Sequence, residues 1–124
     1  MTADSKRALI VEDEPLICMM AADSLEELGF QTMQAGSAAQ ALKFAESADG
    51  LLAFALVDLG LPDMPGEQLL TTLQERHPSL PIIVASGRGK PDLAPSPSQA
   101  RLIVLPKPYS FEDLKAAISQ LELS

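Results

Sequence analysis

Acidic side chains follow two short apolar stretches of this 124-residue chain. Glu12 and Asp13 come directly after residues 8–11, and Asp58 ends the apolar run that begins at residue 51. A carboxylate at the tip of a buried strand is costly to desolvate unless a cation or hydrogen-bond donors meet it. Mg²⁺ fits, because it is a hard ion that is commonly held by one or two carboxylates together with waters and phosphate oxygens. We therefore predict a Mg²⁺ site formed by Glu12, Asp13 and Asp58.

A carboxylate in such a site can also act as a nucleophile. If Asp58 gives one oxygen to the metal, its other oxygen is free to attack phosphorus and form an aspartyl phosphate. Phosphoryl transfer depends mainly on positioning and on neutralisation of charge. Ser86 and Lys107 follow two further apolar stretches and offer a hydroxyl and an ammonium group to phosphoryl oxygens. Pro108 allows a cis peptide bond at modest cost, which would aim the lysine at the site.

Five short apolar stretches alternate with segments of helical pattern. These stretches are the expected strands, at residues 6–11, 30–35, 51–58, 81–86 and 102–105. Nearly all-apolar strands that alternate with helices form a parallel sheet with helices on both faces, and its ligands bind at the carboxyl ends of the strands. Because every candidate residue above falls at such an end, we expect one site. The second strand is more polar and is expected at an edge.

Helical patterns fill most of the connections between these strands. The expected helices span about 15–28, 37–48, 67–76 and 110–121. Ser37 and Ser110 each begin a capping-box pattern, in which a polar side chain three residues later returns a hydrogen bond. The connection at residues 88–101 contains three prolines and few large apolar side chains. We therefore expect a loop with at most a turn or two of helix there, so that the fourth helix is short or absent.

The first expected helix carries apolar residues around much of its circumference. Helical spacing predicts that Leu16 and Met20 face the core, and we expect Met19 to fill the core as well. Cys18 lies within the same apolar pattern. We expect it to be a small core residue, because a nucleophilic cysteine requires an exposed, electropositive setting.

Length and composition limit the classes of function. The chain is long enough for a single domain, residues 1–124, with a core at about 6–122. A formal net charge of −8 argues against direct nucleic-acid binding, and a single cysteine excludes an intrachain disulfide. No apolar run reaches the roughly 20 residues that span a bilayer, and the start of the chain lacks a signal-peptide core. We expect no membrane insertion and a cytoplasmic location.

Taken together, these motifs resemble those of response regulator receiver domains of the CheY-like type, over essentially the whole chain. The matching stretches are residues 11–15, 57–66, 85–87 and 107–108. The resemblance implies a doubly wound five-stranded sheet with the flavodoxin-like strand order 2-1-3-4-5. It implies that a histidine kinase or histidine phosphotransfer protein phosphorylates Asp58, and that the backbone carbonyl of Gly60 joins Glu12, Asp13 and Asp58 around Mg²⁺. Ser86 and Lys107 would contact the phosphoryl oxygens.

Two departures from the family pattern concern how the site communicates with a partner. Many receivers carry an aromatic residue three positions before the lysine, where this chain has Val104, and Tyr109 is our candidate to take over as the local reporter. The proline-rich segment replaces a regular fourth helix. The stretch Ala85-Ser86-Gly87 and the weakened fourth helix are similar to a subgroup of receivers that has an Ala-Ser/Thr-Gly motif and a weakened fourth helix.

Three other functions compete with a phosphoacceptor. A Mg²⁺-dependent phosphatase of the haloacid dehalogenase type would carry an Asp-x-Asp motif, but Gly60 takes the second position. A flavodoxin-like nucleotide binder would cradle phosphate with a Gly- and Ser-rich first loop, and this one is acidic. A receiver-like interaction module that is never phosphorylated remains the main alternative.

The expected protein is therefore not an enzyme, beyond slow loss of its own phosphoryl group. Since no output domain follows Ser124 in this sequence, we expect its effect to pass through a downstream protein, a homodimer or a parent hybrid protein.

Overall fold

The computed structural model describes residues 7–48, 52–61, 63–86, 102–107 and 109–121. Five strands form one sheet in the order β2-β1-β3-β4-β5, and every neighbouring pair is parallel. The strands are β1 (Arg7–Val11), β2 (Gln31–Ala35), β3 (Leu52–Asp58), β4 (Ile82–Ser86) and β5 (Leu102–Pro106). This confirms the expected strand order and places the polar strand β2 at an edge.

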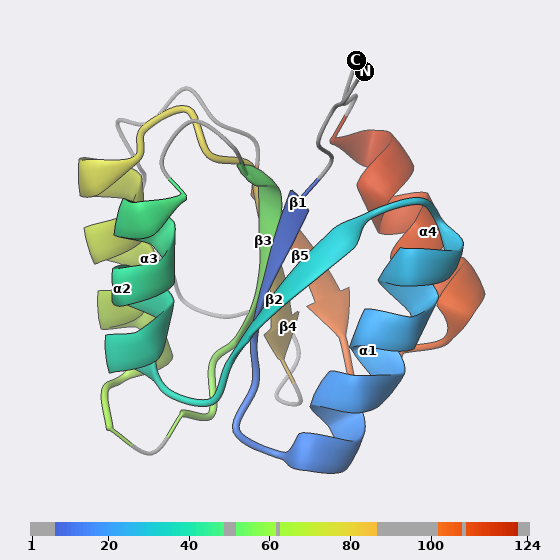
Figure 1. Ribbon diagram of the computed structural model, residues 1–124, viewed down its shortest axis with the longest axis horizontal. Helices are drawn as coiled ribbons and strands as arrows, with labels where there is room; N and C mark the ends of the chain where they lie inside the picture. Colours follow the sequence, from blue (N-terminus) through green and yellow to red (C-terminus); the bar gives the residue numbers. More distant parts are fainter. Residues whose placement is uncertain (1–6, 49–51, 62, 87–101, 108, 122–124) are drawn as a thin grey trace.

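Four helices cover the sheet in the described part of the chain. They are α1 (Pro15–Glu27), α2 (Ala38–Ser47), α3 (Gly66–Arg76) and α4 (Phe111–Gln120). Helices α1 and α4 lie on one face of the sheet, and α2 and α3 lie on the other (Figure 1). The doubly wound architecture is thereby confirmed. The helix expected to be short or absent falls at residues 88–100, which lie outside the described residues.

Side chains of the central strands point alternately into two cores. In β3, Phe54 and Leu56 belong to the core beneath α1 and α4, whereas Ala55 and Val57 belong to the core beneath α2 and α3. The ring of Phe30 meets that of Phe54 edge-on, with centroids 5.1 Å apart. Since both faces of the sheet are covered, its inner strands must be apolar throughout, which is the pattern that the sequence shows.

The inward face of α1 differs from the sequence prediction. Leu16, Met19 and Met20 are 63%, 53% and 61% exposed, so the prediction that they fill the core was wrong. The helix instead packs through smaller residues and one leucine: Cys18, Ala21, Ala22 and Leu25. Apolar residues surround much of α1, so spacing alone did not identify one face, and small side chains let the helix approach the sheet.

The expected core role of Cys18 agrees with the structure. Its side chain is buried, and its Sγ atom lies 3.6 Å from Oε1 of Gln34. Burial, assisted by the negative charge of Glu12, raises the pKa of the thiol. A thiol that resists deprotonation is a poor nucleophile.

The two helix caps were predicted with different success. In α4, Ser110 and Asp113 exchange both hydrogen bonds of a capping box, at 3.1 and 3.0 Å. In α2, Oγ of Ser37 accepts from the backbone N–H of Gln40 at 3.2 Å, but Oε1 of Gln40 accepts from the N–H of Gly36 instead of returning to Ser37. The second half of this cap is therefore displaced by one residue.

Candidate functional site

The expected site residues meet at one rim of the sheet. Glu12 and Asp13 follow β1, while Asp58 and Ser86 are the last residues of β3 and β4. Lys107 follows β5, and its backbone N–H donates to the carbonyl of Ser86 at 2.9 Å. Parallel pairing in register brings these strand ends together, so residues distant in sequence share one site.

Three carboxylates form a tight acidic cluster there. One oxygen each from Glu12, Asp13 and Asp58 lies within 4.8 Å of the others. Glu12 and Asp58 are buried, at 5% and 7% exposure, whereas Asp13 is exposed. Like charges this close repel one another unless a proton or a cation intervenes. The donor set consists of hard oxygen ligands with one open, solvent-facing side, and it fits a Mg²⁺ ion that keeps some of its waters.

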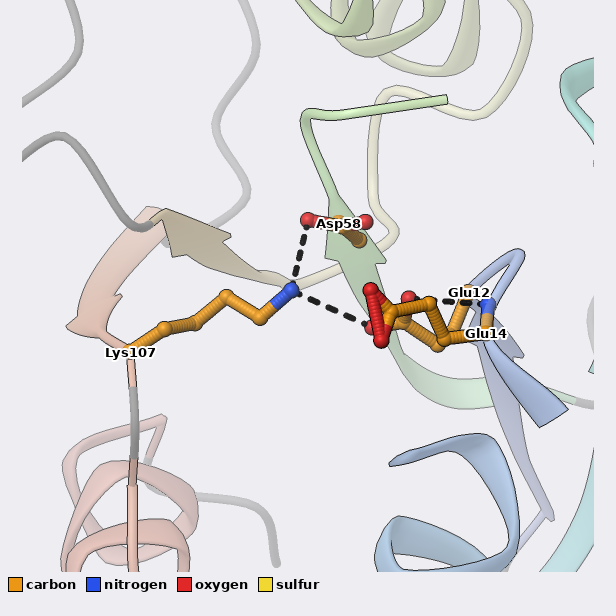
Figure 2. Close-up of polar contacts among 4 residues, drawn as sticks. All are labelled: Glu12, Glu14, Asp58 and Lys107. Carbon is orange, nitrogen blue, oxygen red and sulfur yellow. Dashed lines mark hydrogen bonds and ion pairs between the residues drawn. The ribbon is translucent and has the colours of Figure 1, made fainter. Parts of the chain in front are cut away.

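Lys107 provides a positive charge beside both Asp58 and Glu12. Its side chain extends across the rim from β5, and Nζ lies 3.1 Å from Oδ1 of Asp58 and 3.4 Å from Oε1 of Glu12 (Figure 2). The second carboxylate oxygen of Glu12 accepts a hydrogen bond from the backbone N–H of Glu14 at 3.2 Å. The lysine thus bridges two of the three acids and holds Asp58 in a defined orientation.

The titration behaviour of these groups reflects their mutual charges. Burial raises the pKa of Glu12, and the charge of Asp58 adds to this, although the Glu14 N–H and Lys107 act in the opposite direction. Burial by itself lowers the pKa of Lys107, but its hydrogen bond to Asp58 and the charges of Asp58 and Glu12 raise that pKa overall. Lys107 therefore remains an ammonium at neutral pH.

The loop between β3 and α3 begins beside the Asp58 carboxylate. The backbone N–H of Leu59 donates to the carbonyl of Ala85 at 3.3 Å. A Cβ atom placed on Gly60 would lie 3.6 Å from Oδ2 of Asp58, so Gly60 is beside the carboxylate. Gly66, the first residue of α3, packs so closely on the backbone of Leu59 that it leaves no room for a side chain.

Asp63, in the loop between β3 and α3, is a residue for which the sequence pattern predicted no role. Its carboxylate accepts hydrogen bonds from the backbone N–H groups of Ala38 and Ala39 at the start of α2, at 2.9 and 3.2 Å. Chiefly the bond from Ala38 lowers the pKa of Asp63. These contacts join positions 24 and 25 residues apart in sequence, so no local pattern could have predicted them.

Tyr109 lies within electrostatic reach of the acidic cluster. Its side chain is partly buried and packs against the core of α1 and α4. Burial, with a further contribution from the charge of Glu12, raises the pKa of its phenol to about 12. Val104, at the position where many receivers carry an aromatic residue, lies in β5. The peptide bond at Pro108, for which the sequence allows the cis form, lies outside the described residues.

No helix within the described ranges has the length and apolar content needed to cross a membrane.

Comparison with known proteins agrees with this architecture. The family model for the response regulator receiver domain matches residues 8–119. The chain is 30% identical to sensor kinase CckA of Brucella abortus over 94% of its own length and 12% of CckA. It is 32% identical to the two-component response regulator PhoP of Pseudomonas aeruginosa, over 93% of its own length and 51% of PhoP. The chain thus spans about half of the length of PhoP and a much smaller part of the length of CckA.

A solved receiver-domain structure has a similar fold. The CheY-like receiver domain from Methylobacillus flagellatus is 30% identical and superposes with a TM-score of 0.76, covering 95% of this chain and 99% of that domain. The residues matched by the family model include the rim that carries the acidic cluster. This chain belongs to the response regulator receiver domain family of two-component systems.

Proposed function

We propose that the chain accepts a phosphoryl group on Asp58 from a phosphohistidine of a histidine kinase or histidine phosphotransfer protein. The observation that carries this proposal is the setting of Asp58. It is a buried carboxylate at a strand end, clustered with two other acids and 3.1 Å from the Lys107 ammonium. A mere strand-end cap would need neither the acids nor the lysine.

The chemistry requires one bond to form as another breaks. An oxygen of Asp58 attacks phosphorus, the P–N bond of the phosphohistidine breaks, and its electron pair stays on the imidazole nitrogen. The carboxylate charge is lost, and the phosphoryl oxygens bring new negative charge. Lys107, which already lies beside Oδ1 of Asp58, is positioned to follow that charge, and the hydroxyl of Ser86 would donate to another phosphoryl oxygen.

Glu12, Asp13, Asp58 and the backbone carbonyl of Gly60 would hold Mg²⁺. When bound, the ion would neutralise charge on the acids and on the phosphoryl oxygens. The tight cluster of carboxylate oxygens supports this assignment. It would also explain why three acids are gathered at one rim, where the Lys107 ammonium group faces two of them.

Membership of the family supports a proposal for the wider role of the chain. The domain would act as a phosphorylation-dependent switch in the cytoplasm, where its single cysteine would stay reduced. It would lose its phosphoryl group slowly to water and would not turn over a metabolite. Its output would pass to a protein partner, a second copy of the chain, or the remainder of a longer protein. Relatives named as a sensor kinase and as a response regulator support such settings.

Intact-mass spectrometry tests the proposal. Incubation with acetyl phosphate and Mg²⁺ should add one phosphoryl group, and a chelator should prevent the addition. Asp58→Asn should give no adduct, while Asp23→Asn, which removes an exposed acid in the middle of α1, should react like the wild type. If the wild type forms no adduct, the chain is a receiver-shaped interaction module.

A further inference from the structure

Two different side chains close the N-terminus of α2. The first backbone N–H groups of a helix have no partner within the helix. In α2, the N–H of Gln40 donates to the local cap Ser37. Those of Ala38 and Ala39 donate to Asp63, which belongs to the loop between β3 and α3. One carboxylate therefore receives two charge-assisted hydrogen bonds from a separate element.

The segment between β2 and α2, which donates hydrogen bonds to Asp63, also contacts the segment that carries Glu12 and Asp13. The carbonyl of Ala35, the last residue of β2, accepts a hydrogen bond from the backbone N–H of Glu12 at 3.0 Å. Residues 35–39 thus hold the start of the Glu12–Asp13 segment at one end and the loop that follows Asp58 at the other. Both segments carry proposed Mg²⁺ ligands.

Asp63 lies in the same loop as Gly60 and shortly after Asp58, two of the residues proposed to bind Mg²⁺. Gly60, whose carbonyl is a proposed ligand, lies three residues before Asp63 and beside the carboxylate of Asp58. Other anchors of the loop are the apolar side chains of Leu61 and Met64, which pack into the core of α2 and α3. Leu61 and Met64 hold the loop onto the core, whereas Asp63 binds it to the N-terminus of α2.

We propose that Asp63 is a positioning residue that holds the β3–α3 loop in its Mg²⁺-binding conformation. This inference rests on the proposed function. Without the bonds from Asp63 to α2, the loop samples further conformations, of which only a fraction place Gly60 and Asp58 correctly relative to Glu12. The apparent Mg²⁺ affinity falls in proportion to that fraction.

Ser37 supplies a matched control, because its Oγ caps the same helix by accepting from the N–H of Gln40, within its own segment of the chain. Mg²⁺ titration by calorimetry and urea unfolding should be measured for wild type, Asp63→Ala and Ser37→Ala. Both variants should unfold at lower urea concentration. Asp63→Ala should bind Mg²⁺ about tenfold more weakly, at the lower end of outer-shell effects, and Ser37→Ala should stay within about twofold of the wild type. Asp63→Asn, which keeps one acceptor oxygen, should fall between them.

Amide hydrogen exchange provides a readout independent of the metal. The N–H of Leu59 should exchange faster in Asp63→Ala than in Ser37→Ala under conditions where both are folded. The inference is overturned if Asp63→Ala and Ser37→Ala bind Mg²⁺ equally while the wild type binds Mg²⁺ and is phosphorylated; Asp63 is then only a cap, and the proposed function stands. A wild type that does neither overturns the proposed function together with this inference, so the two failures are distinct.

Discussion

Replacing Lys107 with methionine removes a charge but keeps most of the side chain's volume. Nζ of Lys107 lies 3.1 Å from Asp58 and 3.4 Å from Glu12. At an effective dielectric constant of about 20, each attraction amounts to about 5 kcal/mol before desolvation is subtracted. The variant keeps both acids but loses the cation between them. Lys107→Met should therefore be less stable than the wild type when Mg²⁺ is absent.

The net loss is smaller than the sum of these attractions. Removing one partner of a buried ion pair typically costs about 3–5 kcal/mol, because the other charge is left buried and unpaired. The side chain of Lys107 is 21% exposed, so water screens part of the interaction, and we expect a loss of about 2–3 kcal/mol. The free energy of unfolding should fall by about 2 kcal/mol per molar of urea, so the unfolding midpoint should be lower by about 1–1.5 M.

Mg²⁺ should narrow this difference in stability. Under the proposed function the ion and the lysine would both neutralise Asp58 and Glu12, so Mg²⁺ should bind the variant about tenfold more tightly, which is worth about 1.4 kcal/mol. Urea unfolding followed by circular dichroism, with a chelator and then with saturating Mg²⁺, measures both effects. Lys43→Met, on the exposed side of α2, controls for the loss of a positive charge.

Two results would refute this reasoning. If Lys107→Met were as stable as the wild type in the chelator, the lysine would not be compensating the acids. If Mg²⁺ left the difference between the two proteins unchanged, the ion and the lysine would not share the same carboxylates.

Three further predictions concern neighbouring residues. Gly66→Ala should lower stability by about 1–3 kcal/mol, because the new methyl group would press on the backbone of Leu59, 2.7 Å from its carbonyl oxygen; wild-type urea unfolding would contradict this. Ultraviolet absorbance should show Tyr109, the single tyrosine, ionising at about pH 12 in the folded protein and at about pH 10 in urea. Since its pKa is raised by folding, its contribution to stability is complete below the unfolded pKa and is lost as the pH rises toward 12; equal midpoints would contradict the burial of the phenol. Ser86→Ala should bind Mg²⁺ like the wild type but accept phosphoryl groups more slowly, and an equal rate would exclude the hydroxyl from the reaction.

The fold could be predicted because its signals are local and repeated. All-apolar strands such as β3 and β4 indicate a sheet covered on both faces, and Pro15 marks the start of a helix. The meeting of the candidate residues at one rim follows from a rule about parallel sheets, while the strand order came from the family resemblance. The sequence therefore indicated which residues share the site.

Features that depend on tertiary packing were not predictable from spacing. Leu16 and Met20 fit an inward helical face, yet the close approach of Ala21 and Ala22 to the sheet leaves both exposed. Asp63 contacts a helix 24 residues earlier in the chain, and nothing near it in sequence identifies that partner. In both cases the outcome depends on which elements become neighbours.

Chemical mapping of the phosphorylated residue tests the central claim most directly. Borohydride reduces an aspartyl phosphate to homoserine, which peptide mass spectrometry can locate. After treatment with a phosphodonor and Mg²⁺, homoserine should appear at position 58 and not at Asp13, and Glu12, whose acyl phosphate would be reduced to 5-hydroxynorvaline, should stay unchanged. Homoserine at another aspartate, or a phosphoryl group that resists reduction, would contradict the assignment of Asp58 as the acceptor.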